Sequence, residues 1–167
     1  VGDSPLIVHA WSEKAKKEIL DKQMKVAKTK VRSIRNPAAD FIDSLYWLTK
    51  KPAEPTMEAF YQAVAEGAEF GFPSVAFKAA AVSAGFRTGV TKNKTIPNSA
   101  FHINGDMVRI YGTPEIREDM VRVGMGAADL RYRGEFKEWS VILPIRFNMA
   151  VFTHEQIINL FNLGGFA

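Results

Sequence analysis

The sequence predicts an α+β fold in which an antiparallel sheet is packed by helices. Helical patterns fill residues 38–85, short extended segments follow one another from residue 100 to residue 147, and a further amphipathic helix closes the chain. Strands that succeed each other without intervening helices favour an antiparallel sheet over a parallel, doubly wound one. The 167 residues, 47% of them hydrophobic, are enough for one core. We expect a single domain over residues 1–167 that lacks residues at both ends, because its termini are Val1 and an apolar, glycine-rich segment.

The first expected elements are a short strand and a surface helix. Pro5 to Trp11 is an apolar run with β-branched residues, which is typical of a buried strand. Ser12 can cap a helix whose first residue, Glu13, suits the positive end of the helix dipole. The apolar residues that follow are too sparse for a core stripe. We therefore expect this helix to lie on the surface and to end at Asn36-Pro37.

Three amphipathic or small-residue helices are expected next. Ala38 to Leu48 has a strong apolar face at helical spacing, and Thr56 to Ala65 has a second one. Pro73 begins an alanine-rich helix that runs to Ala84, with Gly85 as its C-terminal cap. Its small side chains predict close approach to a neighbouring element.

Extended segments dominate the second half of the chain. Residues 87–98 are polar and predict a loop. Asn104-Gly105 tolerates positive φ and predicts a hairpin between strands at Ala100–Ile103 and Met107–Tyr111. Further strands are expected near Met120–Val123, at Asp129–Arg133 and within Trp139–Phe147, and a final helix begins at Thr153 or His154.

Positive charge is concentrated near the amino end. The net charge is +4, with a calculated pI near 9.3. Between residues 14 and 35 only Glu18 and Asp21 oppose nine basic residues, so this stretch carries +7 and the rest of the chain −3. The nine are Lys14, Lys16, Lys17, Lys22, Lys25, Lys28, Lys30, Arg32 and Arg35. A row of lysines on flexible stems can neutralise phosphates and release counterions, which favours nucleic-acid binding.

A second basic group lies in the strand region. In a strand Arg131 and Arg133 point to one face and Tyr132 to the other. Paired arginines on a sheet can clamp a phosphate or stack on bases. They can equally pair with the nearby acids Asp129, Glu135 and Glu138, and the sequence leaves both interpretations open.

Catalytic signatures are weak. The chain has no cysteine, and its three histidines lack the spacing of a helical metal site. No glycine-rich phosphate loop or nucleophile elbow is present. We therefore predict no enzyme activity, no metal and no cofactor. No apolar run reaches membrane-span length, and residues 1–4 lack a basic-then-apolar leader pattern, so we expect a cytoplasmic protein without membrane contact.

Several segments resemble a family of bacteriophage proteins of uncharacterised function. They are PLIVHAWSEKAK, FGFPSVAFKAA, REDMVRVG, RYRGEFKEWSVILPIRFN and EQIINLFNLGGFA, which together span most of the chain. Gly164-Gly165 is also similar to the start of the glycine-rich loop in ferredoxin-like, CRISPR repeat-associated RNA-binding proteins. The first resemblance implies a phage origin, and thus the host cytoplasm. The second implies a ferredoxin-like sheet and RNA as a partner.

These observations predict a non-catalytic phage-type protein that binds single-stranded DNA or RNA through a basic helix and an arginine-bearing sheet. The alternative is a protein–protein interaction module, either a phage inhibitor of a host nucleic-acid-processing complex or a self-assembling structural subunit. The alanine-rich helix and the apolar C-terminal end would make its contacts. A third hypothesis, a metal-dependent nuclease, would depend on Asp119 or Asp129. The residues predicted to bind nucleic acid are Lys14, Lys17, Lys22, Lys25, Lys28, Lys30, Arg32, Arg35, Arg131 and Arg133.

Overall fold

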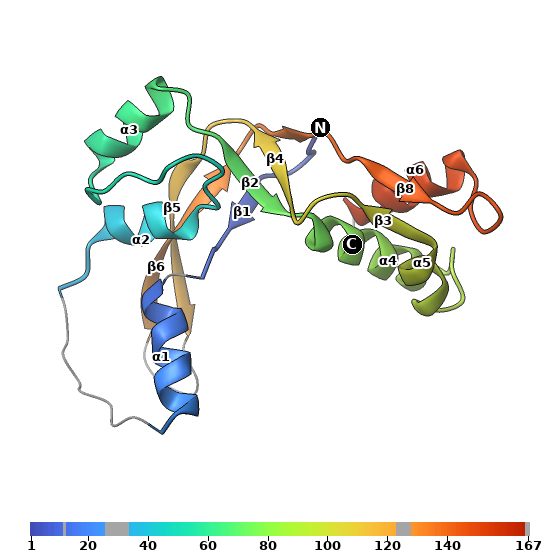
Figure 1. Cartoon of the computed structure of the whole chain (residues 1–167), viewed down its shortest axis with the longest axis horizontal. Helices are drawn as coiled ribbons and strands as arrows, with labels where there is room; N and C mark the ends of the chain where they lie inside the picture. The colour runs from blue at the N-terminus through green and yellow to red at the C-terminus, as the bar shows by residue number, and fades with distance from the viewer. Residues whose placement is uncertain (12, 26–33, 123–127, 166–167) are drawn as a thin grey trace. The chain divides into compact units, whose positions relative to one another are not determined.

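A computed structural model describes residues 1–11, 13–25, 34–122 and 128–165, with Lys14 described in its backbone only. The chain forms two compact units, each assembled from separate stretches of sequence (Figure 1). The aromatic unit comprises Pro5–Phe70 and Gly112–Lys137. The helix-pair unit comprises Val1–Ser4, Gly71–Tyr111 and Glu138–Ala167. Both contain helices and antiparallel strands, which confirms the α+β class. The single domain stays a prediction.

The aromatic unit contains a three-stranded antiparallel sheet in the order β1-β6-β5. Its strands are β1 (Leu6–Val8), β5 (Glu115–Arg122) and β6 (Ala128–Phe136), and its helices are α1 (Glu13–Gln23), α2 (Pro37–Ser44) and α3 (Met57–Ala65). Helix α2 packs on β6. The core is rich in aromatic rings, with Phe41 and Phe60 edge-on at 4.9 Å and Phe70 5.9 Å from Phe136.

Local signals explain where α2 and α3 begin. The Asn36 side chain accepts hydrogen bonds from two amides of the first turn of α2, and Pro37 occupies a position where no amide hydrogen is needed. The Thr56 hydroxyl caps α3 in the same way. Helix α2 ends at Ser44, earlier than the predicted Leu48, because Leu45 is extended and the chain turns there to bring Trp47 beside Phe70.

The helix-pair unit is built on α4 (Ser74–Arg87) and α6 (His154–Gly164), which pack together. A capping box of Thr153 and Gln156 begins α6. Ala81 and Leu160 are fully buried in the core between the two helices, so the predicted close approach of the alanine-rich helix is confirmed. The remaining elements are β2 (Phe70–Pro73), whose first residue belongs to the aromatic unit, α5 (Thr95–Ala100), β3 (Phe101–Ile103), β4 (Met107–Tyr111), β7 (Ser140–Val141) and β8 (Ile145–Phe147).

The hairpin predicted at Asn104-Gly105 is wrong. Strand β3 pairs with β8 and strand β4 pairs with β7, so Phe101–Tyr111 runs along Ser140–Phe147 instead of folding back on itself. Gly105 does adopt a positive φ of 85°, but it lies in a bulge in which six residues, 104–109, face three, 142–144. The Ser74 hydroxyl donates to the Gly105 carbonyl oxygen over 2.5 Å and holds the bulge against the start of α4.

Three other boundaries differ from prediction. Gly85 is not a cap: α4 continues to Arg87, and Gly85 is buried where a Cβ would clash with Leu160. The predicted loop at residues 87–98 contains the start of α5. Helix α1 ends at Gln23, because Lys25 has a φ of 56° that a right-handed helix does not allow.

In the described part of the chain the sheets have three, three and two strands, and none has the β-α-β-β-α-β connectivity of a ferredoxin-like fold.

Candidate nucleic-acid interface

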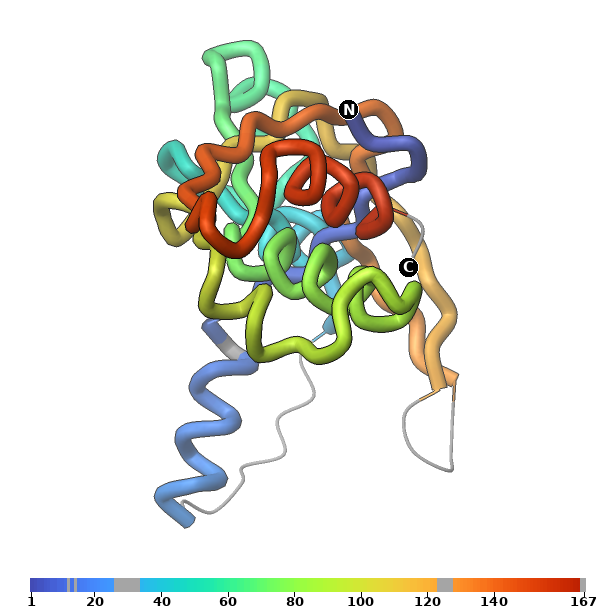
Figure 2. Tube along the Cα trace, turned by 90° about the vertical axis from the view of Figure 1, so that its right-hand side faces the viewer, coloured from blue at the N-terminus to red at the C-terminus, as the bar shows by residue number. Residues whose placement is uncertain are grey.

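Helix α1 is the most solvent-exposed helix of the aromatic unit. Of its side chains that the structure describes, only Ala15 and Asp21 are partly covered. Both views show α1 extending away from α2 and α3 of the same unit (Figure 1, Figure 2). The expectation of a surface helix is confirmed. Few apolar residues recur at core spacing, so little of the helix can be buried.

Three of the predicted lysines project from α1 and its end into solvent. Lys17, Lys22 and Lys25 are exposed, and no carboxylate in the described residues lies within ion-pair distance of them. Lys16 pairs with Glu13 one turn away, at 2.6 Å. The side chain of Lys14, together with Lys28, Lys30 and Arg32, lies outside the described residues.

Arg35 is in a different situation, because two carboxylates of its own chain hold it. Its Nε donates to Asp40 and its Nη1 to Asp129, each at 2.7 Å. These hydrogen bonds raise the pKa of Arg35, and the bond from Arg35 lowers the pKa of Asp129. Arg35 thus ties the start of α2 to β6 and is already neutralised.

Arg131 and Arg133 share one face of β6, as the strand period predicts, and that face carries a network of ion pairs. In the ladder with β5, Arg131 lies opposite Asp119 and Arg133 opposite Arg117. Arg131 contacts Asp129 at 3.6 Å, and Arg133 contacts Asp119 at 3.4 Å. Arg117 donates to Asp119 at 2.8 Å and to Glu135 at 2.5 Å. The structure therefore favours pairing with the protein's own acids over a phosphate clamp.

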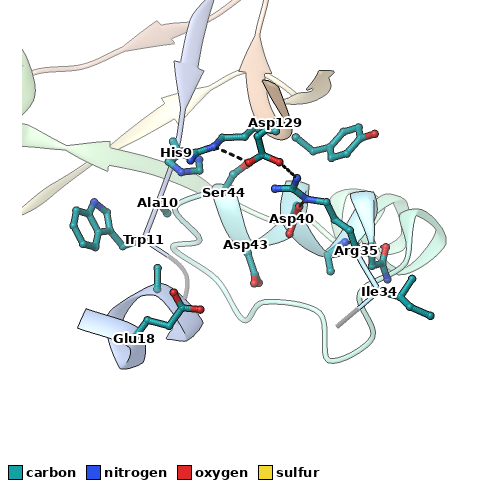
Figure 3. Close-up of a pocket in the computed structure, with 15 residues that line it drawn as sticks. His9, Ala10, Trp11, Glu18, Ile34, Arg35, Asp40, Asp43, Ser44 and Asp129 are labelled. Carbon is teal, nitrogen blue, oxygen red and sulfur yellow. Dashed lines mark hydrogen bonds and ion pairs between the residues drawn. The ribbon is translucent and has the colours of Figure 1, made fainter. Parts of the chain in front are cut away.

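Sequence reasoning missed a pocket of about 870 Å³ in the aromatic unit. Figure 3 shows Arg35 turned toward Asp129 in it, with His9 and Ser44 nearby and Trp11 and Glu18 on another wall. Four acids line the pocket, Glu18, Asp40, Asp43 and Asp129, against two arginines, Arg35 and Arg131. This balance opposes the binding of phosphate.

His9 borders the same pocket. Partial burial lowers its pKa below the ordinary 6.5, the charges of Arg133 and Arg131 lower it further, and Asp40 acts in the opposite direction. His9 therefore favours the neutral imidazole. Its position in the strand predicted over Pro5–Trp11 gave no signal that these arginines would lie close to it; in the structure His9 follows β1.

The structure adds two observations on other classes of site. In the described ranges of the chain, no three histidine or carboxylate side chains come close enough together to hold a metal ion. No described helix combines the length and the apolar character needed to cross a bilayer.

Comparison of the chain with protein-family models, with curated proteins and with solved structures gives no match. The resemblance to a bacteriophage family stays a prediction.

Proposed function

We propose that the protein binds nucleic acid without catalysis, through the basic segment from Lys14 to Arg35. The observation that carries this proposal is the exposure of Lys17 and Lys22 on α1 and of Lys25 just after its end, without carboxylate partners in the described residues. The whole segment carries +7 by sequence. Lysines without carboxylate partners can neutralise phosphates, and the release of the cations condensed on the nucleic acid then supplies affinity.

The contact is assigned to the basic segment and not to the sheet. The guanidinium groups of Arg131 and Arg133 on the sheet already lie within ion-pair distance of Asp129 and Asp119. Arg35, the last residue of the basic segment, is held by Asp40 and Asp129 in the same way and is not expected to contribute to the contact. A phosphate would have to displace these carboxylates. The proposed ligand is single-stranded DNA or RNA, which is flexible enough to follow a single projecting helix. A phage-encoded protein of this kind would act in the host cytoplasm.

The test is a titration of labelled single-stranded DNA, duplex DNA and RNA by fluorescence anisotropy at two salt concentrations. The variant Lys17→Ala/Lys22→Ala/Lys25→Ala removes three phosphate contacts. The slope of log K against log salt should then fall by about 2 for a single strand, at about 0.7 per contact. Affinity at low salt should fall at least about tenfold.

The matched control makes the same charge change elsewhere. Lys50, Arg87 and Lys92 are exposed and lie outside the basic segment, so Lys50→Ala/Arg87→Ala/Lys92→Ala should retain most of the affinity. Equal losses in the two triple variants would mean that only net charge matters. Unchanged affinity in the α1 variant would overturn the proposal.

A protein–protein interaction module is the second candidate, because α1 and the residues on either side of it also expose large apolar side chains. Trp11 is 61% exposed, Leu20 53% and Met24 67%. Such residues on a basic helix suit a groove on another protein. Light scattering after size-exclusion chromatography, with and without an oligonucleotide, separates the candidates. Assembly that is independent of the oligonucleotide and lost in Trp11→Ser would favour the second.

A further inference from the structure

Strand β5 forms an open edge of the sheet in the aromatic unit. The order β1-β6-β5 leaves one side of β5 without a neighbour among the described residues. The strand is long and regular: its eight residues, Glu115 to Arg122, pair with β6 in continuous register, without a bulge or a proline. Proteins usually protect such an edge, because its free amide and carbonyl groups can pair with another strand.

The side chains on one face of β5 are exposed and alternate in character. Ile116 is 41% exposed and Met120 76%, and the exposed Glu118 and Arg122 lie on either side of Met120. Glu118 accepts a hydrogen bond from Tyr132 on β6, which raises the pKa of that tyrosine and orients the carboxylate. The strand thus presents an acid, an apolar side chain and a base, in that order.

We infer that two copies of this chain associate by pairing β5 with β5 in antiparallel orientation about a two-fold axis centred on Met120. Met120 then lies opposite Met120 of the partner subunit. Glu118 lies opposite the partner's Arg122, and Arg122 opposite the partner's Glu118. When the strand is reversed in the partner, each acid lies opposite a base and the apolar residue lies opposite its own copy. This single pairing therefore places Met120, the most exposed apolar side chain of β5, between two pairs of opposite charge.

Other symmetric registers are less favourable. Centring on Arg117, Glu118 or Asp119 places two identical charges opposite each other, which destabilises a ladder. Centring on Ile116 extends the pairing to Pro114, which has no amide hydrogen to donate. Centring on Val121 places Met120 opposite the partner's Arg122 and leaves Glu118 without a basic partner in β5.

This interface goes beyond the proposed function and does not depend on it. Association is measured without nucleic acid, and nucleic-acid binding is measured on the same variants. If both hold, each pair of copies carries two basic helices, and a strand long enough to reach both would bind more tightly than it binds one.

The test is sedimentation velocity over a concentration series with the full chain. Glu118→Arg and Arg122→Glu each place two like-charge pairs in the dimer and should weaken association at least about tenfold. The double variant Glu118→Arg/Arg122→Glu restores opposite charges in this register and should recover most of the association. Glu54→Arg, an exposed charge reversal away from β5, should associate like wild type.

Met120→Lys provides a second arm that does not depend on charge exchange. It places two cations at the centre of the interface and should leave only monomer, while circular dichroism confirms the native fold. A wild-type protein that stays monomeric at every concentration would overturn the inference. So would a double variant as weak as the two single variants, or a Met120→Lys protein that still dimerises.

Discussion

Helix α1 and strand β6 both contain several basic residues, but those on β6 are paired with carboxylates and most of those described on α1 are not. On α1, Lys17 and Lys22 are exposed and have no carboxylate partner among the described residues. On β6, Arg131 and Arg133 lie in a ladder that supplies Asp129 and Asp119 as partners. A count of cations therefore does not measure the charge available to a ligand. On the sheet, cross-strand and same-strand carboxylates neutralise the basic side chains. On a projecting helix, basic side chains have no such neighbours and stay available to a ligand.

The largest expected difference between the two regions concerns packing. Gly134 on β6 lies under α2, and a Cβ there would clash with the Leu45 side chain and come within 2.9 Å of Val8 Cγ2. Both neighbours are buried, so neither can move aside cheaply. Gly134→Val should lower the free energy of unfolding by about 3 kcal/mol. The measurement is urea denaturation followed by circular dichroism.

Gln23→Val on α1 is the matched control, because it adds the same branched side chain at an exposed helical position. Its cost should be at most about 0.5 kcal/mol, the difference in helix propensity. A comparable loss at the two positions would contradict the contrast between a packed sheet and an exposed helix.

Breaking ion pairs should have a smaller effect, and only on the sheet. Arg117 bridges Asp119 and Glu135, whose side chains are only 18% and 12% exposed. Arg117→Ala leaves these partly buried carboxylates without their main partner and should lower the urea midpoint, by less than Gly134→Val does. Lys17→Ala on α1 should stay within about 0.5 kcal/mol of wild type.

Urea midpoints of Arg117→Ala and Lys17→Ala, measured in low and moderate salt, check this contrast. The loss in Arg117→Ala should persist in salt, because partly buried charges are screened less than exposed ones. If the Arg117 variant were as stable as the Lys17 variant, the ion-pair network would not contribute to the stability of the fold.

The sequence predicts the parts of this fold that depend on neighbouring residues. Helices are expected over Thr56–Ala65 and from Thr153 or His154, and α3 and α6 lie there. In the structure each threonine caps its helix, because its hydroxyl accepts a hydrogen bond from an amide of the first turn. The surface position of α1 follows from its sparse apolar residues.

Long-range pairing is what local patterns could not predict. Arg35 binds Asp129, which lies 94 residues away in sequence. Asn104-Gly105 has the residues of a tight turn, but β3 pairs with β8 and β4 lies between β2 and β7, so the two strands do not pair with each other. The acidic pocket is formed in the same way, because α1, α2 and β6 contribute to it from distant segments.

The smallest expected effect concerns pH and separates the pocket from α1. Partial burial and the charges of Arg133 and Arg131 lower the pKa of His9, so the folded state binds a proton there less well than the unfolded chain does. The stability that neutral His9 contributes is complete above pH 6.5 and is lost progressively as the pH falls below it. The urea midpoint should therefore fall between about pH 7.5 and pH 5.5 by more in wild type than in His9→Gln, which cannot take up a proton in this range.

Asp40 favours protonation of His9, so Asp40→Asn should lower the pKa of His9 further. The urea midpoint of Asp40→Asn, measured relative to its own value at about pH 7.5, should then fall with decreasing pH by more than that of wild type. Parallel curves for wild type and His9→Gln would mean that the imidazole does not sense the two arginines. The sheet arginines would then influence only the carboxylates that they contact, and the electrostatic contrast with α1 would be confined to those pairs.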